Sequence, residues 1–124
     1  MIVTKHSPWS VDDTIARLES TISAKGQKLF LVIDHSGEAE AHGLALRDTK
    51  VIIFGGPEAG TPIMQAHPLA ALDLPLKVLV WNNDGETLLA YTPPAELVAR
   101  YDLADELAAR LNGIDAVTDA AIAT

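Results

Sequence analysis

The 124-residue sequence contains no cysteine, few aromatic residues and no cluster of basic side chains. The absence of cysteine excludes disulfides, thiol catalysis, iron–sulfur clusters and zinc sites built on thiolates. Nine Lys and Arg residues stand against seventeen Asp and Glu residues, so the formal net charge is −8. Nucleic acids and anionic membranes attract proteins through basic surfaces. We therefore expect neither nucleic-acid binding nor membrane binding.

Long apolar runs are also missing. No run approaches the roughly 18 residues that a membrane-spanning helix needs, and the first ten residues, MIVTKHSPWS, have neither a charged leader nor an apolar signal core. These features predict a cytoplasmic protein. The length fits a single domain, 1–124, that is large enough to bury its own core. Hydrophobic residues make up 48% of the chain and aromatic residues only 5%, so the core is expected to be aliphatic.

The first half of the chain alternates between strand and helix patterns. Residues 2–6 predict a short strand, and residues 10–26 predict a helix with a Ser cap, one apolar stripe and a closing Gly. Five consecutive apolar residues at 29–33 predict a strand that is covered on both faces. Residues 36–43 are small and polar and indicate a short helix or a loop, and residues 51–54 predict the next strand.

The second half predicts a hairpin followed by helices. A helix is expected to start near Gly60 and to be interrupted at Pro68. Residues 76–81 and 87–92 flank an Asp-Gly pair, which is a strong signal for a β-hairpin. Pro93 and Pro94 then open a helical third, in which a helix with Leu103, Leu107 and Leu111 on one face ends at Asn112-Gly113, and a last helix starts near Asp115.

This order of elements predicts an α+β fold, with a mainly antiparallel sheet and helices packed on one face. The predicted strands are apolar on both faces: Val51 and Ile53 alternate with Ile52 and Phe54, for example. Helices on one face would leave the other apolar face in contact with water, which is rare for a patch of several hundred Å². We therefore predict a homodimer that forms through the helix-free sheet face.

Three ordered segments carry a resemblance to a known family. They are Ile33-Asp34-His35, the stretch 54–64 (FGGPEAGTPIM), and the stretch 71–81 (ALDLPLKVLVW) followed by Tyr91. Together they resemble the bacterial domain of unknown function 302 family across essentially the whole chain. The resemblance implies a TATA-binding-protein-like α+β fold, β-α-β4-α in outline, and small homodimers without an established activity. Gly56 departs from the family pattern, in which Asn is expected in the form F-G-N-P.

The histidine at the end of the 29–33 strand is the first candidate for chemistry. Asp34 and His35 form a pair there, and Glu38 and His42 follow one helical turn apart. His35, Glu38 and His42 offer three nitrogen and oxygen ligands for a divalent metal, and an oriented imidazole also suits a general base. The alternative is structural: Asp34 and His35 satisfy backbone groups while Glu38 and His42 are solvated.

A glycine-containing loop follows the next strand. Gly55 and Gly60 have the spacing of a phosphate-binding loop, but Thr61 and Pro62 stand where Lys and Ser or Thr are required. A nucleotide-binding loop is therefore excluded. The loop is expected to be a tight turn, or alternatively a small anion nest made by backbone N–H groups.

The remaining question is whether the chain has a ligand pocket. The candidate lining residues are His35, Phe54, Gly55, Pro57, Trp81 and Tyr91, with Met64 as a further apolar neighbour. The alternative places these aromatic residues in the core or the dimer interface. We expect a homodimeric ligand-binding or interaction module, with no cofactor and an unidentified ligand. The alternative hypothesis is an enzyme or divalent-metal protein with a pocket centred on His35.

Overall fold

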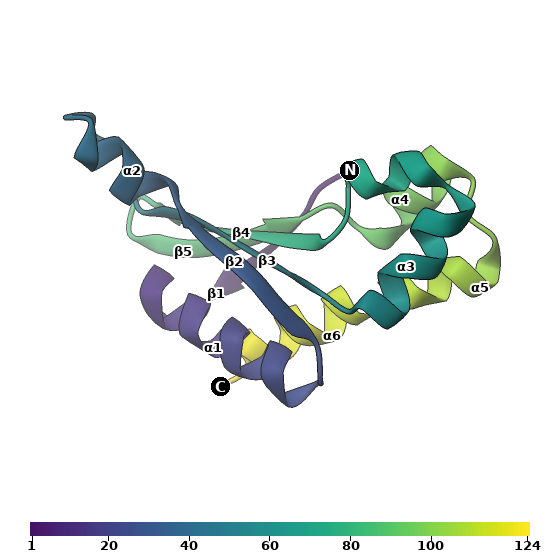
Figure 1. Ribbon diagram of the computed structural model, residues 1–124. Coiled ribbons are helices and arrows are strands. Elements are labelled where there is room, and N and C mark those ends of the chain that lie inside the picture. The colour runs from purple at the N-terminus through teal and green to yellow at the C-terminus, as the bar shows by residue number, and fades with distance from the viewer.

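The computed structural model describes residues 1–124 and has the predicted α+β architecture (Figure 1). Its five strands form one fully antiparallel sheet with the spatial order β1-β5-β4-β3-β2. The strands are β1 (Val3–Ser7), β2 (Lys28–Asp34), β3 (Thr49–Gly55), β4 (Leu76–Asn83) and β5 (Glu86–Tyr91). The edges of the sheet are therefore β1 and β2, which lie far apart although they are close in sequence.

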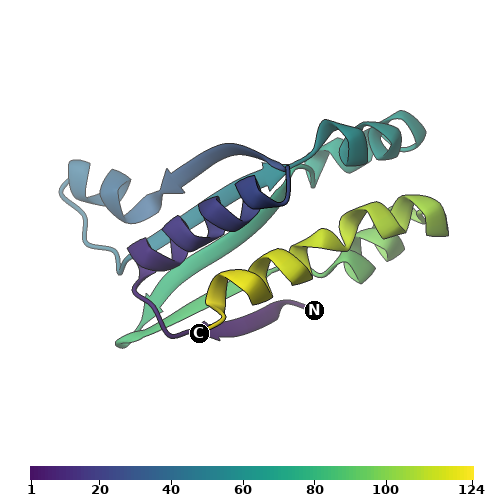
Figure 2. The same cartoon turned by 90° about the horizontal axis from the view of Figure 1, so that it is seen from below.

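Two long helices cover one face of this sheet. Helices α1 (Val11–Ala24) and α6 (Gly113–Ile122) pack side by side across it, as Figure 2 shows. Ser10 caps α1 by accepting a 3.0 Å hydrogen bond from the Asp13 backbone N–H, as its cap pattern predicts. The apolar stripe of α1 meets alternate residues of the central strands, and the aliphatic core between them includes Leu18, Ile22, Ile52, Val78, Val80, Leu89 and Val117.

No helix covers the opposite face of the sheet. This face is concave: α2 (His35–Ala41) projects at one end of it, and α3 (Pro57–Ala66) and α4 (Pro94–Tyr101) lie at the other end, so that it has the shape of a saddle (Figure 1). The strand registers place on this face the side chains that alternate with the core residues. We call the following six residues the uncovered face: Leu31, Ile33, Val51, Ile53, Leu79 and Trp81. The prediction of helices on one face only is thus confirmed.

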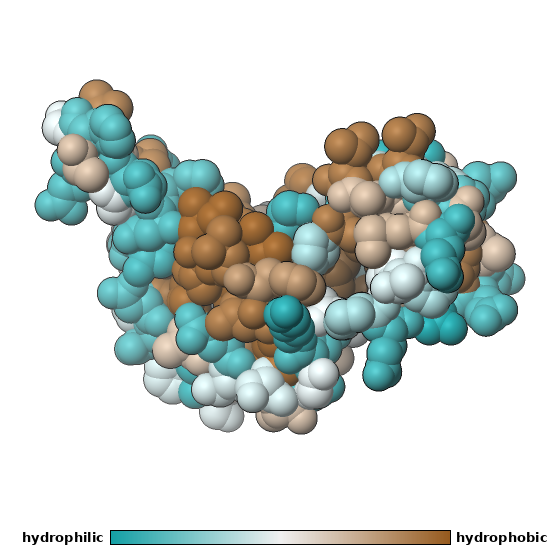
Figure 3. Space-filling model, in the orientation of Figure 1, coloured by the Kyte–Doolittle hydropathy of each residue, from teal (hydrophilic) through white to brown (hydrophobic).

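Strand β2 differs from its prediction. A strand covered on both faces was expected, but Leu29, Phe30 and Leu31 are 38%, 45% and 54% exposed. The reason is that β2 is an edge strand that pairs with β3 alone and has an irregular register between Leu29 and Leu31. The space-filling view shows the resulting apolar patch as a brown area over β2 (Figure 3).

The hairpin prediction is confirmed. Strands β4 and β5 are joined at Asp84 and Gly85, which both have positive φ, 51° and 95°. Two consecutive residues in this conformation match the right-handed twist of the paired strands. The Gly85 backbone N–H also donates a 2.8 Å hydrogen bond to the Asn82 side chain, which fixes the turn.

Two helix boundaries differ from their predictions. Helix α3 begins at Pro57 rather than at Gly60, because the fixed φ of Pro suits the first helical position. It ends at Ala66 and is followed by a short helix, η1 (Pro68–Leu72), as the interruption at Pro68 predicts.

The long helix expected after Pro94 is in fact three pieces. Helix α4 stops where Asp102 adopts a left-handed conformation, and it is followed by α5 (Asp105–Ala108) and η2 (Ala109–Leu111). Leu103 and Leu111 are both buried, so the apolar spacing is used for packing although the helix is broken.

Candidate functional site

The six candidate pocket residues do not share one pocket. Phe54 and Tyr91 are buried in the core, 0% and 3% exposed, and Trp81 lies on the uncovered face. His35 is exposed at the first position of α2, which projects from the body of the molecule (Figure 1). The two remaining candidates, Gly55 and Pro57, do line a common cavity.

The residues around His35 serve to start α2. The Asp34 carboxylate accepts a 2.9 Å hydrogen bond from the Gly37 backbone N–H and another, of 2.8 Å, from the Ser36 hydroxyl. These two hydrogen bonds hold the pKa of Asp34 below its usual range, and the hydrogen bond from Gly37 lowers it most. Glu38 and His42 are exposed on the same helix, where the His42 ring contacts the Glu38 carbonyl at 3.0 Å. The structure gathers no group of three His, Asp or Glu side chains arranged to hold a metal ion.

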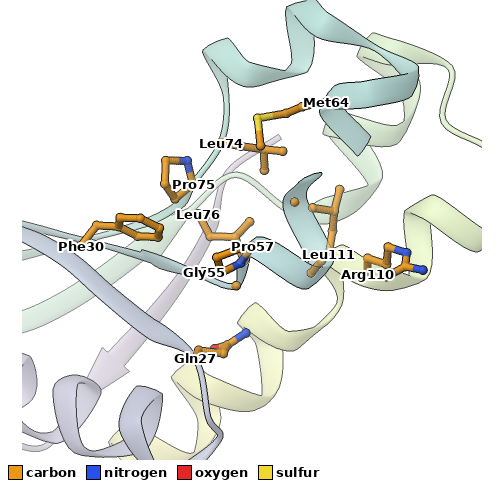
Figure 4. A pocket seen from close by; sticks show the side chains of 13 residues that line it. Gln27, Phe30, Gly55, Pro57, Met64, Leu74, Pro75, Leu76, Arg110 and Leu111 are labelled. Carbon is orange, nitrogen blue, oxygen red and sulfur yellow. The ribbon is translucent and has the colours of Figure 1, made fainter. Parts of the chain in front are cut away.

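A cavity of about 220 Å³ lies at the end of the sheet, between the start of α3, the start of β4 and η2 (Figure 4). Its walls are mainly apolar. The largest side chains on them are Phe30, Met64, Leu74, Pro75, Leu76 and Leu111. It joins segments that are distant in sequence, so its walls are built by the tertiary fold.

The cavity exists because one of its walls has almost no side chains. Gly55, Gly56, Ala59 and Gly60 form this wall where β3 passes into α3. A Cβ atom added to Gly60 would lie 3.7 Å from Met64 Cε and 4.0 Å from Leu74 Cδ1, and one added to Gly56 would meet nothing within 4 Å. Larger side chains at Gly60 would therefore extend among the apolar residues of the opposite wall.

The cavity interior is uncharged. Arg110 contributes to its rim, but its guanidinium group points away from the cavity (Figure 4). There it donates a 3.1 Å hydrogen bond to the Glu58 carbonyl and lies 3.9 Å from the Glu106 carboxylate. The Lys28 ammonium lies 5.1 Å from the centre of the Phe30 ring, outside the apolar walls.

One polar side chain on the lining lacks a partner. Gln27 lies between α1 and β2 and contributes to the cavity wall, and its Oε1 atom is buried without a hydrogen bond. An unsatisfied buried acceptor costs free energy, so this amide is the polar feature that distinguishes the site from an ordinary packing defect.

A polar cluster fastens the helical end of the molecule beside the cavity. Asp73, which precedes the lining residue Leu74, accepts hydrogen bonds from the Tyr101 hydroxyl and, at 2.8 Å, from Arg100 Nη1. The Tyr101 hydrogen bond and then the Arg100 contact lower the pKa of Asp73, and the same Asp73 contact raises the pKa of Tyr101. This cluster ties α4 to the segment that enters β4.

The glycine loop adopts neither of its predicted forms in full. Gly56 precedes α3, and its carbonyl accepts 3.0 Å and 2.9 Å hydrogen bonds from the N–H groups of Ala59 and Gly60. These donors are used within the helix, so the segment is not an open anion nest. Its small residues instead leave the cavity free.

Most of the lining could not be found by searching for reactive residue types. Gln27, Phe30, Leu74, Pro75, Leu76 and Leu111 were not among the candidates. The available signal was the set of small residues at 55, 56, 59 and 60, since Gly56 and Gly60 stand one helical turn apart beside a buried strand.

Comparison with known proteins identifies the family. The model of the family described as Domain of unknown function DUF302 matches residues 3–121. The crystal structure of an uncharacterized conserved protein DUF302 from Bacillus stearothermophilus covers 98% of this chain, with a TM-score of 0.81, 19% sequence identity and 94% of its own chain aligned. At this identity the likeness shows the fold alone.

Curated relatives carry a different name. Proteins named fluoride-specific ion channel FluC 1 from Brucella suis and from Brucella abortus are each 38% identical to this chain over 103 residues. The match covers 82% of this chain but only 41% and 38% of those proteins. The chain therefore spans about two fifths of the length of these relatives. In the present structure, none of the helices has both the length and the apolar composition to cross a bilayer.

Proposed function

The chain belongs to the DUF302 family, and on this premise we propose that it is a cytoplasmic binding module, without chemistry of its own, that works as a homodimer. The uncovered face is the proposed dimer interface. The observation that carries the proposal is that an apolar sheet face with no helix over it ends in an exposed apolar edge strand.

The distribution of charge favours a second copy as the occupant. The chain has seventeen acidic residues, yet no acidic residue of β2, β3 or β4 lies on this face, whose side chains are apolar except for Thr49, Lys77 and the strand-end residues Lys28 and Asn83. Carboxylates are costly to bury without partners, and this face has none in its centre. In a two-fold dimer each patch meets its own copy, so an apolar patch is matched with an apolar patch.

A dimer of this kind needs only a minor part of the chain's surface. A stable interface takes about 800 Å² from each partner, and one chain exposes 7004 Å² in total. The two projecting ends of the saddle, α2 and the region of α3 and α4, stand beside the face (Figure 1). They would add contacts around its apolar centre.

Sedimentation equilibrium at micromolar concentration tests the proposal with one variant and one control. Trp81→Asp places a charge on the uncovered face and is expected to convert dimers to monomers. Leu72→Asp makes a comparable change at a residue that is 79% exposed on η1, outside the face, and is expected to leave the dimer intact. A monomeric wild-type protein, or a dimer that only Leu72→Asp disrupts, would contradict the proposal.

The alternative centred on His35 has less support. His35, Glu38 and His42 are exposed on α2. The open hollow beside this helix is lined by Asp34, Ser36 and Glu40 but by none of these three residues. His35→Ala with metal analysis by mass spectrometry checks this directly. Bound metal that is lost in the variant would restore the metal-protein hypothesis.

The Brucella relatives suggest a second candidate function, that of an accessory domain for a membrane ion channel. Its basis is the 38% identity with two fifths of a protein named fluoride-specific ion channel. The test is fluoride efflux from proteoliposomes that hold the Brucella suis protein with or without the matched segment. Unchanged efflux would remove this candidate.

A further inference from the structure

We propose that the cavity beside α3 is a binding site for a small neutral ring-sized molecule that carries one hydroxyl or amine group. The proposal rests on the volume of the cavity, the chemistry of its walls and the unpartnered amide of Gln27, and it does not depend on dimer formation.

The volume sets the size of the ligand. The cavity measures about 220 Å³, and apolar cavities of about 150 Å³ hold one benzene molecule. A six-membered ring with one or two substituents therefore fits, whereas a nucleotide or a long acyl chain does not.

The walls set its polarity. Phe30, Met64, Leu74 and Leu76 surround the space with carbon and sulfur atoms. Because the guanidinium group of Arg110 is turned outward onto Glu58 and Glu106, no charge inside the cavity would balance an ionised ligand. A charged molecule would lose its hydration without compensation, so a neutral ligand is favoured.

Gln27 supplies the polar contact. Its Oε1 atom is buried and accepts no hydrogen bond, and rotation of the amide exchanges its oxygen and nitrogen. Because this oxygen is buried in the observed rotamer, a ligand O–H or N–H group would satisfy it only after that rotation turns the oxygen toward the cavity. A purely apolar ring would leave the Gln27 oxygen without a hydrogen bond. We therefore expect a ring with a hydroxyl group to bind more tightly than the same ring without one.

The preference is measured with two probes, p-cresol and toluene, which differ by one hydroxyl group. Each is titrated into ¹⁵N-labelled protein and followed by amide chemical shifts. We expect saturable binding of both, with shifts concentrated at the cavity wall around Gly55, Gly60 and Leu111. One additional hydrogen bond predicts about threefold to tenfold tighter binding of p-cresol.

Two substitutions that fill the cavity are compared with a control outside it. Gly60→Leu and Ala59→Leu add bulk to the wall and should weaken both probes at least about tenfold, since the apolar contacts are lost. Ala41→Leu makes the same change as Ala59→Leu on exposed α2, so this control should bind within about twofold of wild type. Using two independent filling positions keeps the test valid if one variant does not fold.

Gln27→Met removes the amide while keeping the length of the side chain. It should bring the affinity of p-cresol down to that of toluene and leave toluene binding in place. The proposal is overturned if neither probe binds saturably, if the folded filling variants bind as wild type does, or if the shifts lie on the uncovered face. Equal affinities of the two probes for the wild-type protein would overturn the assigned ligand class.

Discussion

Arg17 connects the two helices that cover the sheet. From α1 its Nε donates a 2.6 Å hydrogen bond to the carbonyl of Ala121, and its Nη2 donates one of 2.8 Å to that of Ala123. Its guanidinium also lies 4.4 Å from the centre of the Trp9 ring. One side chain thereby satisfies carbonyls at the end of α6, where no backbone partner is left and a positive charge is favourable.

We predict that Arg17→Ala lowers the free energy of unfolding by about 1–3 kcal/mol, because hydrogen bonds to a charged donor are lost at a partly buried position. Urea unfolding followed by circular dichroism measures it. Arg47→Ala, at an exposed position, is the control and should change stability by less than about 0.5 kcal/mol. Equal effects of the two substitutions would show that the Arg17 contacts do not stabilise the docking of α6.

Asp73 predicts a dependence of stability on pH. Its pKa is lowered from the ordinary value of 3.8 by hydrogen bonds from Tyr101 and Arg100, so the ionised carboxylate stabilises the folded state at neutral pH. This contribution is present above that value and is lost as the pH falls through the lower pKa of the folded state, in a window below about pH 4.

Asp73→Asn should therefore reduce stability at pH 7 by about 1–2 kcal/mol and flatten its decline in acid. Tyr101→Phe removes one donor and should raise the pKa of Asp73 toward its usual range. Unfolding free energies measured from pH 7 to pH 2.5 check both variants. Parallel curves for wild type and Asp73→Asn would contradict this role of Asp73.

Among the elements, α4 shows why sequence periodicity alone misplaced a boundary. The leucines at 103, 107 and 111 have helical spacing, and a continuous helix was expected from them. The backbone breaks at Asp102, whose φ and ψ are 49° and 52°. A residue other than glycine in this conformation gives no clear signal in a single sequence, because glycine is the usual marker of such an end.

The same observation yields a prediction. Asp102→Gly should raise the free energy of unfolding by up to about 1 kcal/mol, because glycine adopts the left-handed conformation without steric cost. Ala99→Gly, inside α4, should lower it by about 1 kcal/mol. Thermal unfolding of the two variants gives the comparison, and destabilisation by both would show that Asp102 contributes a side-chain interaction that outweighs its backbone strain.

Elements with strong local signals were predictable from sequence. The Ser10 cap, the Asp84-Gly85 turn and the interruption at Pro68 all depend on a few neighbouring residues, and all three are confirmed. The cavity was not predictable in the same way, because Phe30, Leu74 and Leu111 meet only in the tertiary structure. Of the pocket residues named from the sequence, Gly55, Pro57 and Met64 line it, and all three belong to the segment 54–64, which is continuous in sequence.

At the scale of the whole molecule, net charge and the proposed dimer act against each other. Each copy carries a formal charge of −8, so two copies repel while their apolar faces attract. Salt screens this repulsion over about 10 Å at 0.1 M.

We therefore predict that the dimer becomes several-fold tighter between about 20 mM and 500 mM sodium chloride, as screening lowers the repulsion. Sedimentation velocity at a series of protein concentrations measures the dissociation constant at each salt concentration. Weaker association at high salt would indicate an interface held by ion pairs and would argue against the uncovered face as the contact.

The irregular register of β2 bears on where assembly stops. A sheet with two regular open edges is a template for strand pairing from one molecule to the next, and head-to-tail pairing of that kind grows into a filament. In this chain the bulge between Leu29 and Leu31 interrupts one of the two edges, although that edge carries the most exposed apolar strand. The irregularity disfavours strand addition at this edge, so the exposed apolar residues of β2 are more readily covered by the face-to-face contact proposed above than by growth of the sheet.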